Sequence, residues 1–107
     1  MNAKITALIT TYKRPELLRR AMLSVVGQSY RNLQLSIFDN ASGKDTKDVV
    51  TNLAENDDRV KYHCHSKNIG SLENQRCAFK SIDTPYFSIL SDDDFLAKDF
   101  YKNAMDN

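Results

Sequence analysis

The sequence has little of what marks several specialised classes of protein. Its two cysteines, Cys64 and Cys77, have no close-spaced partner, so a disulfide framework is excluded and we expect both to be free thiols. The formal net charge is only +1, which gives no excess for binding a polyanion, so nucleic acid is not an expected partner. No signal-peptide pattern is present, and the apolar run at residues 5–11 is too short to cross a bilayer. We therefore expect a cytoplasmic protein, with any membrane association supplied by a longer form of the chain.

Length and composition fit a single unit. At 107 residues the chain is one domain at most, large enough for a modest core but short for an enzyme that must hold two substrates. Its 41% hydrophobic and 27% charged residues are ordinary for a globular protein, and no internal repeat or interdomain linker is present. We expect residues 1–107 to form one unit whose size suits half of a larger catalytic domain.

Short apolar runs alternate with amphipathic segments along the whole chain. In order, they predict a strand at 4–10, a helix beginning near Pro15, a strand at 33–38, a helix capped by Asp45 or Thr46, a strand at 59–63, a helix at about 71–81, a strand at 86–90 and a helix at 97–105. This alternation, with nearly continuous apolar strands, predicts an α/β fold in which a mainly parallel sheet carries helices on both faces.

Polar turns follow the expected strands. Residues 10–14, 39–43 and 91–94 come after the first, second and fourth strands, and residues 68–70 come after the third. In open parallel sheets, ligands bind outside the carboxyl ends of the strands. One edge of the sheet is therefore predicted to gather the functional groups.

The most informative turn is acidic. Asp92, Asp93 and Asp94 follow directly on an apolar run, and three adjacent carboxylates repel one another unless a cation or a hydroxyl-rich ligand is bound there. A hard ion such as Mg²⁺ or Mn²⁺, which takes carboxylate, water and phosphate oxygens, would point to a phosphorylated substrate. The alternative is an acidic loop that caps the helix expected at 97–105.

Four motifs stand in order along the chain: Thr10-Thr11-Tyr12-Lys13-Arg14-Pro15, Phe38-Asp39-Asn40-Ala41-Ser42, Asn68-Ile69-Gly70 and Leu90-Ser91-Asp92-Asp93-Asp94. In order, spacing and position at strand ends, they resemble the family 2 glycosyltransferases of the GT-A fold across nearly the whole chain. The resemblance implies the Rossmann-like nucleotide-sugar-binding half of such an enzyme. It also implies a second half beyond Asn107 that supplies the acceptor site and the catalytic base.

By this resemblance, the enzyme would transfer a sugar, with inversion, from a UDP- or dTDP-type donor to a hydroxyl of a sugar, lipid-linked or polysaccharide acceptor. The cofactor would be Mn²⁺ or Mg²⁺, which would neutralise charge on the departing nucleoside diphosphate. Residues 1–107 alone would be inactive, because the acceptor site and base are missing. Their uncovered sheet edge and apolar surface would favour self-association.

The first two motifs would bind the nucleotide. Thr10, Thr11 and Tyr12 would offer backbone donors to the nucleoside, while Tyr12 adds an aromatic face and Arg14 a charge for the phosphates. Asp39 would accept the N3 hydrogen of uracil or thymine, which cytosine lacks. From the residues alone, the first motif can also be a helix-entry turn with two solvated cations, and Asp39 can also be an ordinary turn or cap acid.

The last two motifs carry further assignments by resemblance. Asp93 would bind ribose hydroxyls, Asp94 would bind the metal, and Asp92 would support either role; many relatives also have an acid where this chain has Ser91. Asn68 and Gly70 match an Asn-x-Gly turn in which glycine permits unusual backbone angles near a ligand. The chain then departs from the Ala-Arg-Asn of many relatives with Asn74-Gln75-Arg76, which leaves a plain helix N-terminus as the alternative there.

Three other interpretations are weaker. His63 and His65 share one face of an expected strand, but two ligands fall short of the four of a structural zinc site, so we expect strand-end packing. A receiver-like regulatory module, as one non-catalytic α/β nucleotide- or metal-binding alternative, would need paired acids after the first strand, where Thr10 and Thr11 stand. A sugar nucleotidyltransferase would need a glycine-rich loop there, yet no glycine precedes Gly27.

Overall fold

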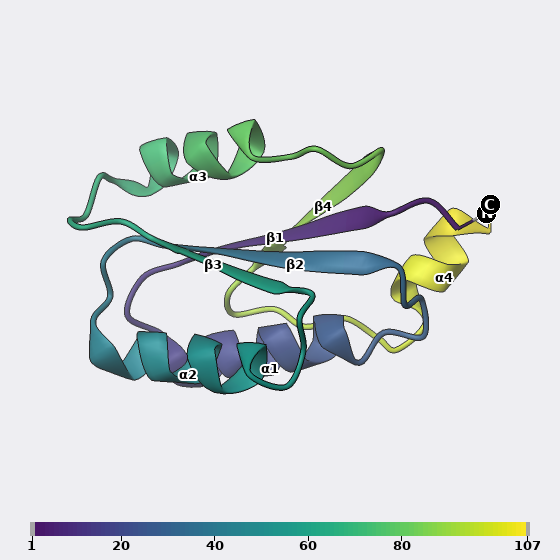
Figure 1. The fold of residues 1–107 in the computed structure, drawn as a ribbon, viewed down its shortest axis with the longest axis horizontal. Helices are drawn as coiled ribbons and strands as arrows, with labels where there is room; N and C mark the ends of the chain where they lie inside the picture. Colours follow the sequence, from purple (N-terminus) through teal and green to yellow (C-terminus); the bar gives the residue numbers. More distant parts are fainter. Residues whose placement is uncertain (1, 107) are drawn as a thin grey trace.

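A four-stranded parallel sheet forms the centre of the molecule (Figure 1). The computed structural model describes residues 2–106. Its elements are β1 (Ile5–Thr11), α1 (Pro15–Val26), β2 (Leu33–Asp39), α2 (Lys44–Ala54), β3 (Val60–Cys64), α3 (Ser71–Lys80), β4 (Tyr86–Ser91) and α4 (Phe100–Met105). The strand order is β3-β2-β1-β4, and every neighbouring pair is parallel. The predicted α/β class and parallel sheet are confirmed.

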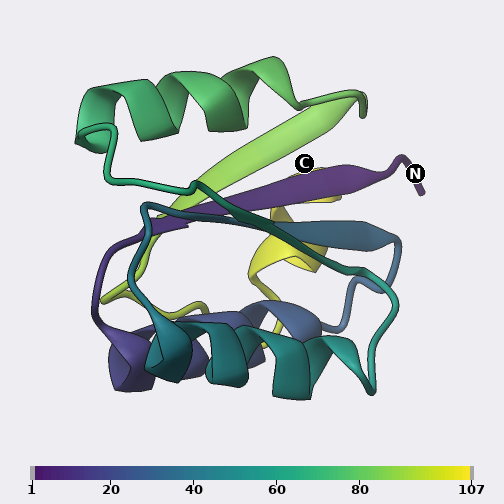
Figure 2. The same cartoon turned by 60° about the vertical axis from the view of Figure 1, so that its left-hand side comes forward.

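Helices cover both faces of this sheet (Figures 1 and 2). Helices α1 and α2 lie along one face, α3 lies on the other, and α4 packs at the far end of the α1 face. The two faces follow from the alternation of side chains along each strand. Alternate residues of β1 and β2 pack with α1 in the larger cluster, which includes Ile5, Ala7, Ile9, Leu35, Ile37, Leu18 and Met22. Leu8 and Phe38 point the other way and pack with Ala78 of α3.

Among residues 2–106 no helix combines the length and apolar character needed to span a bilayer.

Helix α4 is shorter than the sequence pattern predicts. It begins at Phe100 rather than Ala97, because the carbonyl of Ala97 accepts a hydrogen bond from Gln28 Nε2 at 2.6 Å and that of Lys98 accepts one from the backbone N–H of Ser29 at 3.0 Å. Those carbonyls are thus tied to the segment between α1 and β2. The acidic run ends six residues before the helix, so it does not cap α4 as the alternative interpretation required.

Helix α2 also begins differently from the prediction. Its N-cap is Gly43, with φ of 105° and ψ of −168°, and the cap has no side-chain hydrogen bond. Glycine adopts this backbone conformation without the Cβ clash that restricts other residues. Asp45 and Thr46, the expected caps, instead lie inside the first turn. There the negative charge of Asp45 interacts favourably with the positive end of the helix dipole.

The strand register aligns the polar turns at one edge. Thr11 pairs with Asp39 across β1 and β2, Thr10 pairs with Ser91 across β1 and β4, and Asp39 pairs with Cys64 across β2 and β3. The four strands therefore end together, and the turns at 10–14, 39–43, 65–70 and 91–94 all leave the sheet at that edge. The prediction that Asp39 and Asp94 share an edge is confirmed.

Candidate functional site

A pocket of about 410 Å³ opens at this edge, between the ends of β1 and β4 and the start of α3. Its lining residues are Thr10, Thr11, Tyr12, Arg14, Asn40, Ser71, Asn74, Gln75, Ile89, Leu90, Ser91 and Asp92. Five of them, Thr10, Thr11, Tyr12, Arg14 and Asp92, were expected from the sequence. The other expected residues, Asp39, Asn68, Gly70, Asp93 and Asp94, lie at the same edge but outside this lining.

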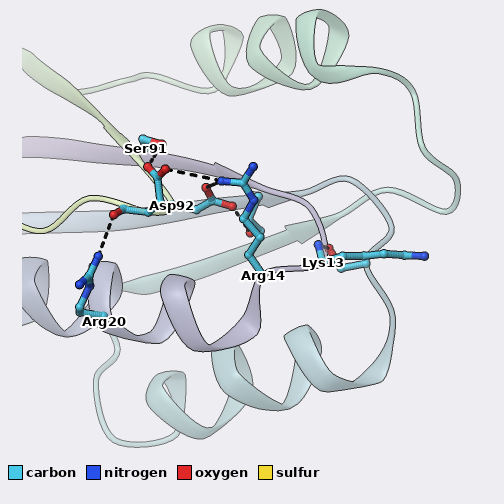
Figure 3. A network of polar contacts seen from close by, with 8 residues as sticks. Lys13, Arg14, Arg20, Ser91 and Asp92 are labelled. Carbon is cyan, nitrogen blue, oxygen red and sulfur yellow. Dashed lines mark hydrogen bonds and ion pairs between the residues drawn. The ribbon is translucent and has the colours of Figure 1, made fainter.

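Asp92 joins the turn after β1 to the turn after β4. Thr11 Oγ1 donates to Asp92 Oδ2 at 2.9 Å, and Arg14 Nη1 donates to Asp92 Oδ1 at 3.3 Å (Figure 3). Asp92 is only 7% exposed, whereas half of the Arg14 side chain faces solvent. A buried carboxylate is tolerated when both oxygens are satisfied in this way. Asp92 therefore acts first as the link that fixes Arg14 at the rim of the pocket.

Asp93 lies beside this link and is held in its ionised form. Ser91 Oγ donates to Asp93 Oδ1 at 2.6 Å, and Arg14 Nη1 lies 3.7 Å from Asp93 Oδ2. The hydrogen bond from Ser91 is the main cause that holds the pKa of Asp93 below its usual value, and the charges of Arg14 and Arg20 act in the same direction. The Ser91 hydroxyl thus orients the neighbouring carboxylate.

Asp94 differs from its two neighbours. Its backbone N–H donates to the carbonyl of Ser91 at 3.1 Å, but no group in the described part of the chain donates to its exposed carboxylate. Within residues 2–106 no three His, Cys, Asp or Glu side chains are arranged to hold a metal ion. Mg²⁺ and Mn²⁺ are commonly held by one or two carboxylates together with water and substrate phosphates. The donor set therefore fits an ion that a bound diphosphate completes, and does not fit a site made of protein ligands alone.

Asp39 is buried at the end of β2. Its Oδ1 accepts hydrogen bonds from the backbone N–H and the hydroxyl of Ser42, at 3.0 and 2.5 Å, and its Oδ2 accepts one from the Tyr62 hydroxyl at 2.6 Å. Burial, together with the hydrogen bond to Asp39, raises the pKa of Tyr62 far above its ordinary value, so Tyr62 remains the donor. The carboxylate is firmly oriented but does not line the pocket.

The Asn68 and Gly70 turn shapes the entry to α3. Gly70 has φ of 87°, a conformation that favours glycine, and its N–H donates to Asn68 Oδ1 at 2.8 Å. The neighbouring N–H of Ile69 donates to Asn40 Oδ1 at 2.8 Å. Asn40 in turn donates its backbone N–H to the carbonyl of Thr11 at 3.0 Å. These bonds tie the turns after β1, β2 and β3 into one rim.

Asn74 is a pocket residue that the sequence alone did not single out for a role. It is 2% exposed, donates from Nδ2 to the carbonyl of Phe38 at 2.9 Å, and lies 2.9 Å through Oδ1 from His65 Nε2. In the sequence, only its position one helical turn after Gly70 indicated that Asn74 could face the site.

His63 packs as expected: its ring stacks on Phe38 with centroids 4.4 Å apart, and burial lowers its pKa. Beyond the pocket, Arg76 pairs with Glu73 on α3 at 2.9 Å.

Comparisons with known proteins agree on one family. A protein-family model described as glycosyl transferase family 2 matches residues 6–107. A curated relative from Campylobacter jejuni, GalNAc(5)-diNAcBac-PP-undecaprenol beta-1,3-glucosyltransferase, is 32% identical over 94 residues, which cover 87% of this chain and 30% of the relative.

Solved structures share the same arrangement of strands and helices. The mannosyltransferase PcManGT from Pyrobaculum calidifontis, in complex with GDP-Man and Mn²⁺, has a TM-score of 0.87 at 20% identity over 98% of this chain and 32% of that one. TarS from S. aureus, in complex with UDP, has a TM-score of 0.86 at 18% identity over 96% of this chain and 31% of that one. The chain thus spans roughly a third of the length of these proteins.

Proposed function

Because the chain belongs to glycosyl transferase family 2 and has the GT-A fold, we propose that it is the donor-binding portion of a metal-dependent, inverting glycosyltransferase. The observation that carries this proposal is the pocket at the carboxyl edge of the sheet. Arg14 stands at its rim as a cation for phosphates, and the exposed Asp94 carboxylate lies in the adjoining turn without a protein donor. A pocket with a cation at its rim and an exposed carboxylate in the adjoining turn suits a diphosphate bound with a divalent ion.

The residues of the edge take separate roles in this proposal. Tyr12, 41% exposed, offers an aromatic face to the nucleoside, and Thr10 and Thr11 form the pocket floor beside it. Asp93, ionised and oriented by Ser91, accepts hydrogen bonds from ribose hydroxyls. Asp94 holds Mn²⁺ or Mg²⁺, whose charge stabilises the departing nucleoside diphosphate. Asn68 and Gly70 form the turn into α3 and complete the nucleotide-binding rim.

A UDP- or dTDP-type donor is proposed from Asp39. A carboxylate has about four acceptor positions, of which Ser42 and Tyr62 occupy three, so one remains for the imide N–H of uracil or thymine. Cytosine presents an acceptor at that position instead. Because the Asp39 carboxylate is buried, the contacts around it must open before the nucleobase can reach it.

The acceptor-binding site and the catalytic base lie in the remainder of a longer protein. The chain covers 30% of the Campylobacter jejuni relative, whose name specifies an undecaprenol-linked acceptor, and this supports a lipid-linked acceptor among the sugar and polysaccharide alternatives. An Asp or Glu outside residues 1–107 would deprotonate the acceptor hydroxyl in the cytoplasm or at a membrane surface. The isolated chain is therefore expected to lack transfer activity; acceptor-dependent turnover by residues 1–107 alone would contradict this division.

A nucleotide panel tests the donor proposal. With Mn²⁺ present, calorimetry should show UDP and dTDP binding to the chain more tightly than CDP, because only uracil and thymine carry a hydrogen at N3. Binding of CDP as tight as that of UDP would remove Asp39 from base selection. Failure of all three to bind would overturn the donor-binding proposal itself.

A further inference from the structure

Arg20 of α1 contacts the acidic turn on both sides of Asp94. Its Nη2 donates to the backbone carbonyl of Asp93 at 2.8 Å, and its guanidinium carbon lies 4.6 Å from the centroid of the Phe95 ring. Figure 3 shows the side chain extending from α1 to this turn. The residues immediately before and after Asp94 are thus both attached to the same helix side chain.

These two contacts need a guanidinium. A planar guanidinium can donate a hydrogen bond along its edge while its face lies on an aromatic ring, whereas a lysine ammonium offers a single compact charge. Phe95 is 62% exposed, and its contact with Arg20 gives this large apolar side chain a defined place. Residues 94–97 belong to no helix or strand, and the bond from Gln28 to the Ala97 carbonyl holds only the far end of this segment.

Arg20 does not line the pocket, so it has no direct route to the nucleotide. Arg20 lies off the apolar stripe of α1, a position that by itself predicts only an exposed side chain. The helical periodicity does not distinguish Arg20 from Arg19, and both side chains are exposed. Unlike Arg20, however, Arg19 makes no hydrogen bond or ion pair within the described residues. The difference between the two arginines is therefore the contact with the acidic turn.

We propose that Arg20, acting through Phe95 and the Asp93 carbonyl, is a positioning residue that holds the Asp94 carboxylate ready for a divalent cation. The inference rests on the proposed function, because it needs Asp94 to bind the metal. Holding the backbone on both sides of one ligand removes conformational freedom that cation binding would otherwise have to remove. The charge of Arg20 acts in the opposite direction, since a nearby positive charge repels the cation.

This opposition of signs makes the proposal testable. If Arg20 acts as a charge alone, its removal should strengthen Mn²⁺ binding; if it positions Asp94, its removal should weaken Mn²⁺ binding. The experiment titrates the chain with Mn²⁺ at saturating UDP, following the electron paramagnetic resonance signal of free Mn²⁺. The variants are Arg20→Gln, Arg20→Lys and Phe95→Leu, with Arg19→Gln as the matched control for loss of one exposed positive charge from the same helix.

We expect Arg20→Gln to weaken Mn²⁺ binding about fivefold and Phe95→Leu about threefold, in line with the strength of an exposed cation–π contact. Arg20→Lys should fall between Arg20→Gln and the unaltered chain, and Arg19→Gln should match the unaltered chain. The double variant Arg20→Gln/Phe95→Leu should be little weaker than Arg20→Gln alone, because both changes remove the same contact.

The outcomes separate this inference from the proposed function. Mn²⁺ binding in Arg20→Gln that equals or exceeds that of the unaltered chain, or an equal loss in Arg19→Gln, overturns the positioning role and leaves the donor site standing. If the unaltered chain binds no Mn²⁺ in the presence of UDP, the donor site is overturned and the positioning role with it. Unfolding in urea identifies any variant that fails to fold, and the Phe95→Leu variant then decides the question.

Discussion

Thr11 and Asp92 lie 81 residues apart in sequence, yet the Thr11 hydroxyl donates to the Asp92 carboxylate at 2.9 Å. The contact crosses from the end of β1 to the turn after β4, and both side chains are buried. It holds the turn after β1 and the acidic turn after β4 at a fixed separation. The stability of the sheet edge and the shape of the pocket therefore depend on the same hydrogen bond.

Replacing Thr11 with valine tests this dependence. The Thr11→Val variant keeps the shape of the side chain but leaves Asp92 Oδ2 without its donor, which should lower the free energy of unfolding by about 1–3 kcal/mol. Urea denaturation measures the change. Thr51→Val is the control, because the Thr51 hydroxyl donates to Lys47 within its own helix and its loss should cost little. Equal stability of Thr11→Val and the unaltered chain would show that the contact is incidental.

Tyr62 provides a similar test for Asp39. The Tyr62→Phe variant removes the donor to the buried Asp39 Oδ2 and should lower the free energy of unfolding by about 1–3 kcal/mol. Tyr86→Phe should change it by less than about 0.5 kcal/mol, because Tyr86 is exposed at the start of β4. The comparison uses urea denaturation at neutral pH. If both variants lose the same stability, Asp39 does not depend on Tyr62.

The grouping of the polar turns and the burial of individual site residues could be predicted from the sequence to different extents. The turn residues 10–14, 39–43 and 91–94 follow apolar runs, and parallel strands bring such turns to one edge, so their grouping was predictable. The burial of Asp39 was not, because its partner Tyr62 stands 23 residues away on β3 and pairs with it only once the strand order is known.

The end of the chain shows the same limit. Local propensity favoured a helix beginning at Ala97. Instead, Gln28, 69 residues away, donates a hydrogen bond to the Ala97 carbonyl, and the helix begins at Phe100. The contacts of Arg20 with the turn after β4 are equally non-local, since periodicity marked Arg20 only as exposed. Long-range hydrogen bonds to backbone carbonyls leave no local pattern in the sequence.

His63 is exposed overall, but its ring stacks on Phe38, and this partial shielding should make stability depend on pH. Burial lowers its pKa in the folded chain, so the unfolded chain takes up the proton first as pH falls through about 6.5. The contribution of His63 is therefore fully present above that pH and declines as pH falls toward the folded-state pKa. Unfolding in urea at pH 7.5 and 5.0 should show a loss of stability that His63→Gln reduces most. His65→Gln should reduce it less, because the charge of His65 is the second cause of the lowered pKa of His63. A loss unchanged in His63→Gln would place its origin in another group.

The edge strand β4 should promote self-association of the isolated chain. Phe87 is 50% exposed on β4, which has a partner strand on only one side among the described elements. Sedimentation at increasing concentration should show association that Phe87→Lys reduces. Leu23→Lys, which places the same charge at an exposed apolar position of α1, should leave it unchanged. A monomer at all concentrations, or equal effects of the two changes, would exclude association through β4.

The most direct test of the donor-site account is the metal dependence of UDP binding. Calorimetric titration of the chain with UDP should show binding with Mn²⁺, little binding in chelator, and at least about tenfold weaker binding with Mn²⁺ in Asp94→Ala, because that change removes a metal ligand. Asp58→Ala, which removes an exposed acid at the opposite edge of the sheet, should bind as the unaltered chain does. Equal UDP affinity with Mn²⁺ and with chelator, or an Asp94→Ala variant that binds as tightly as Asp58→Ala, would contradict the account.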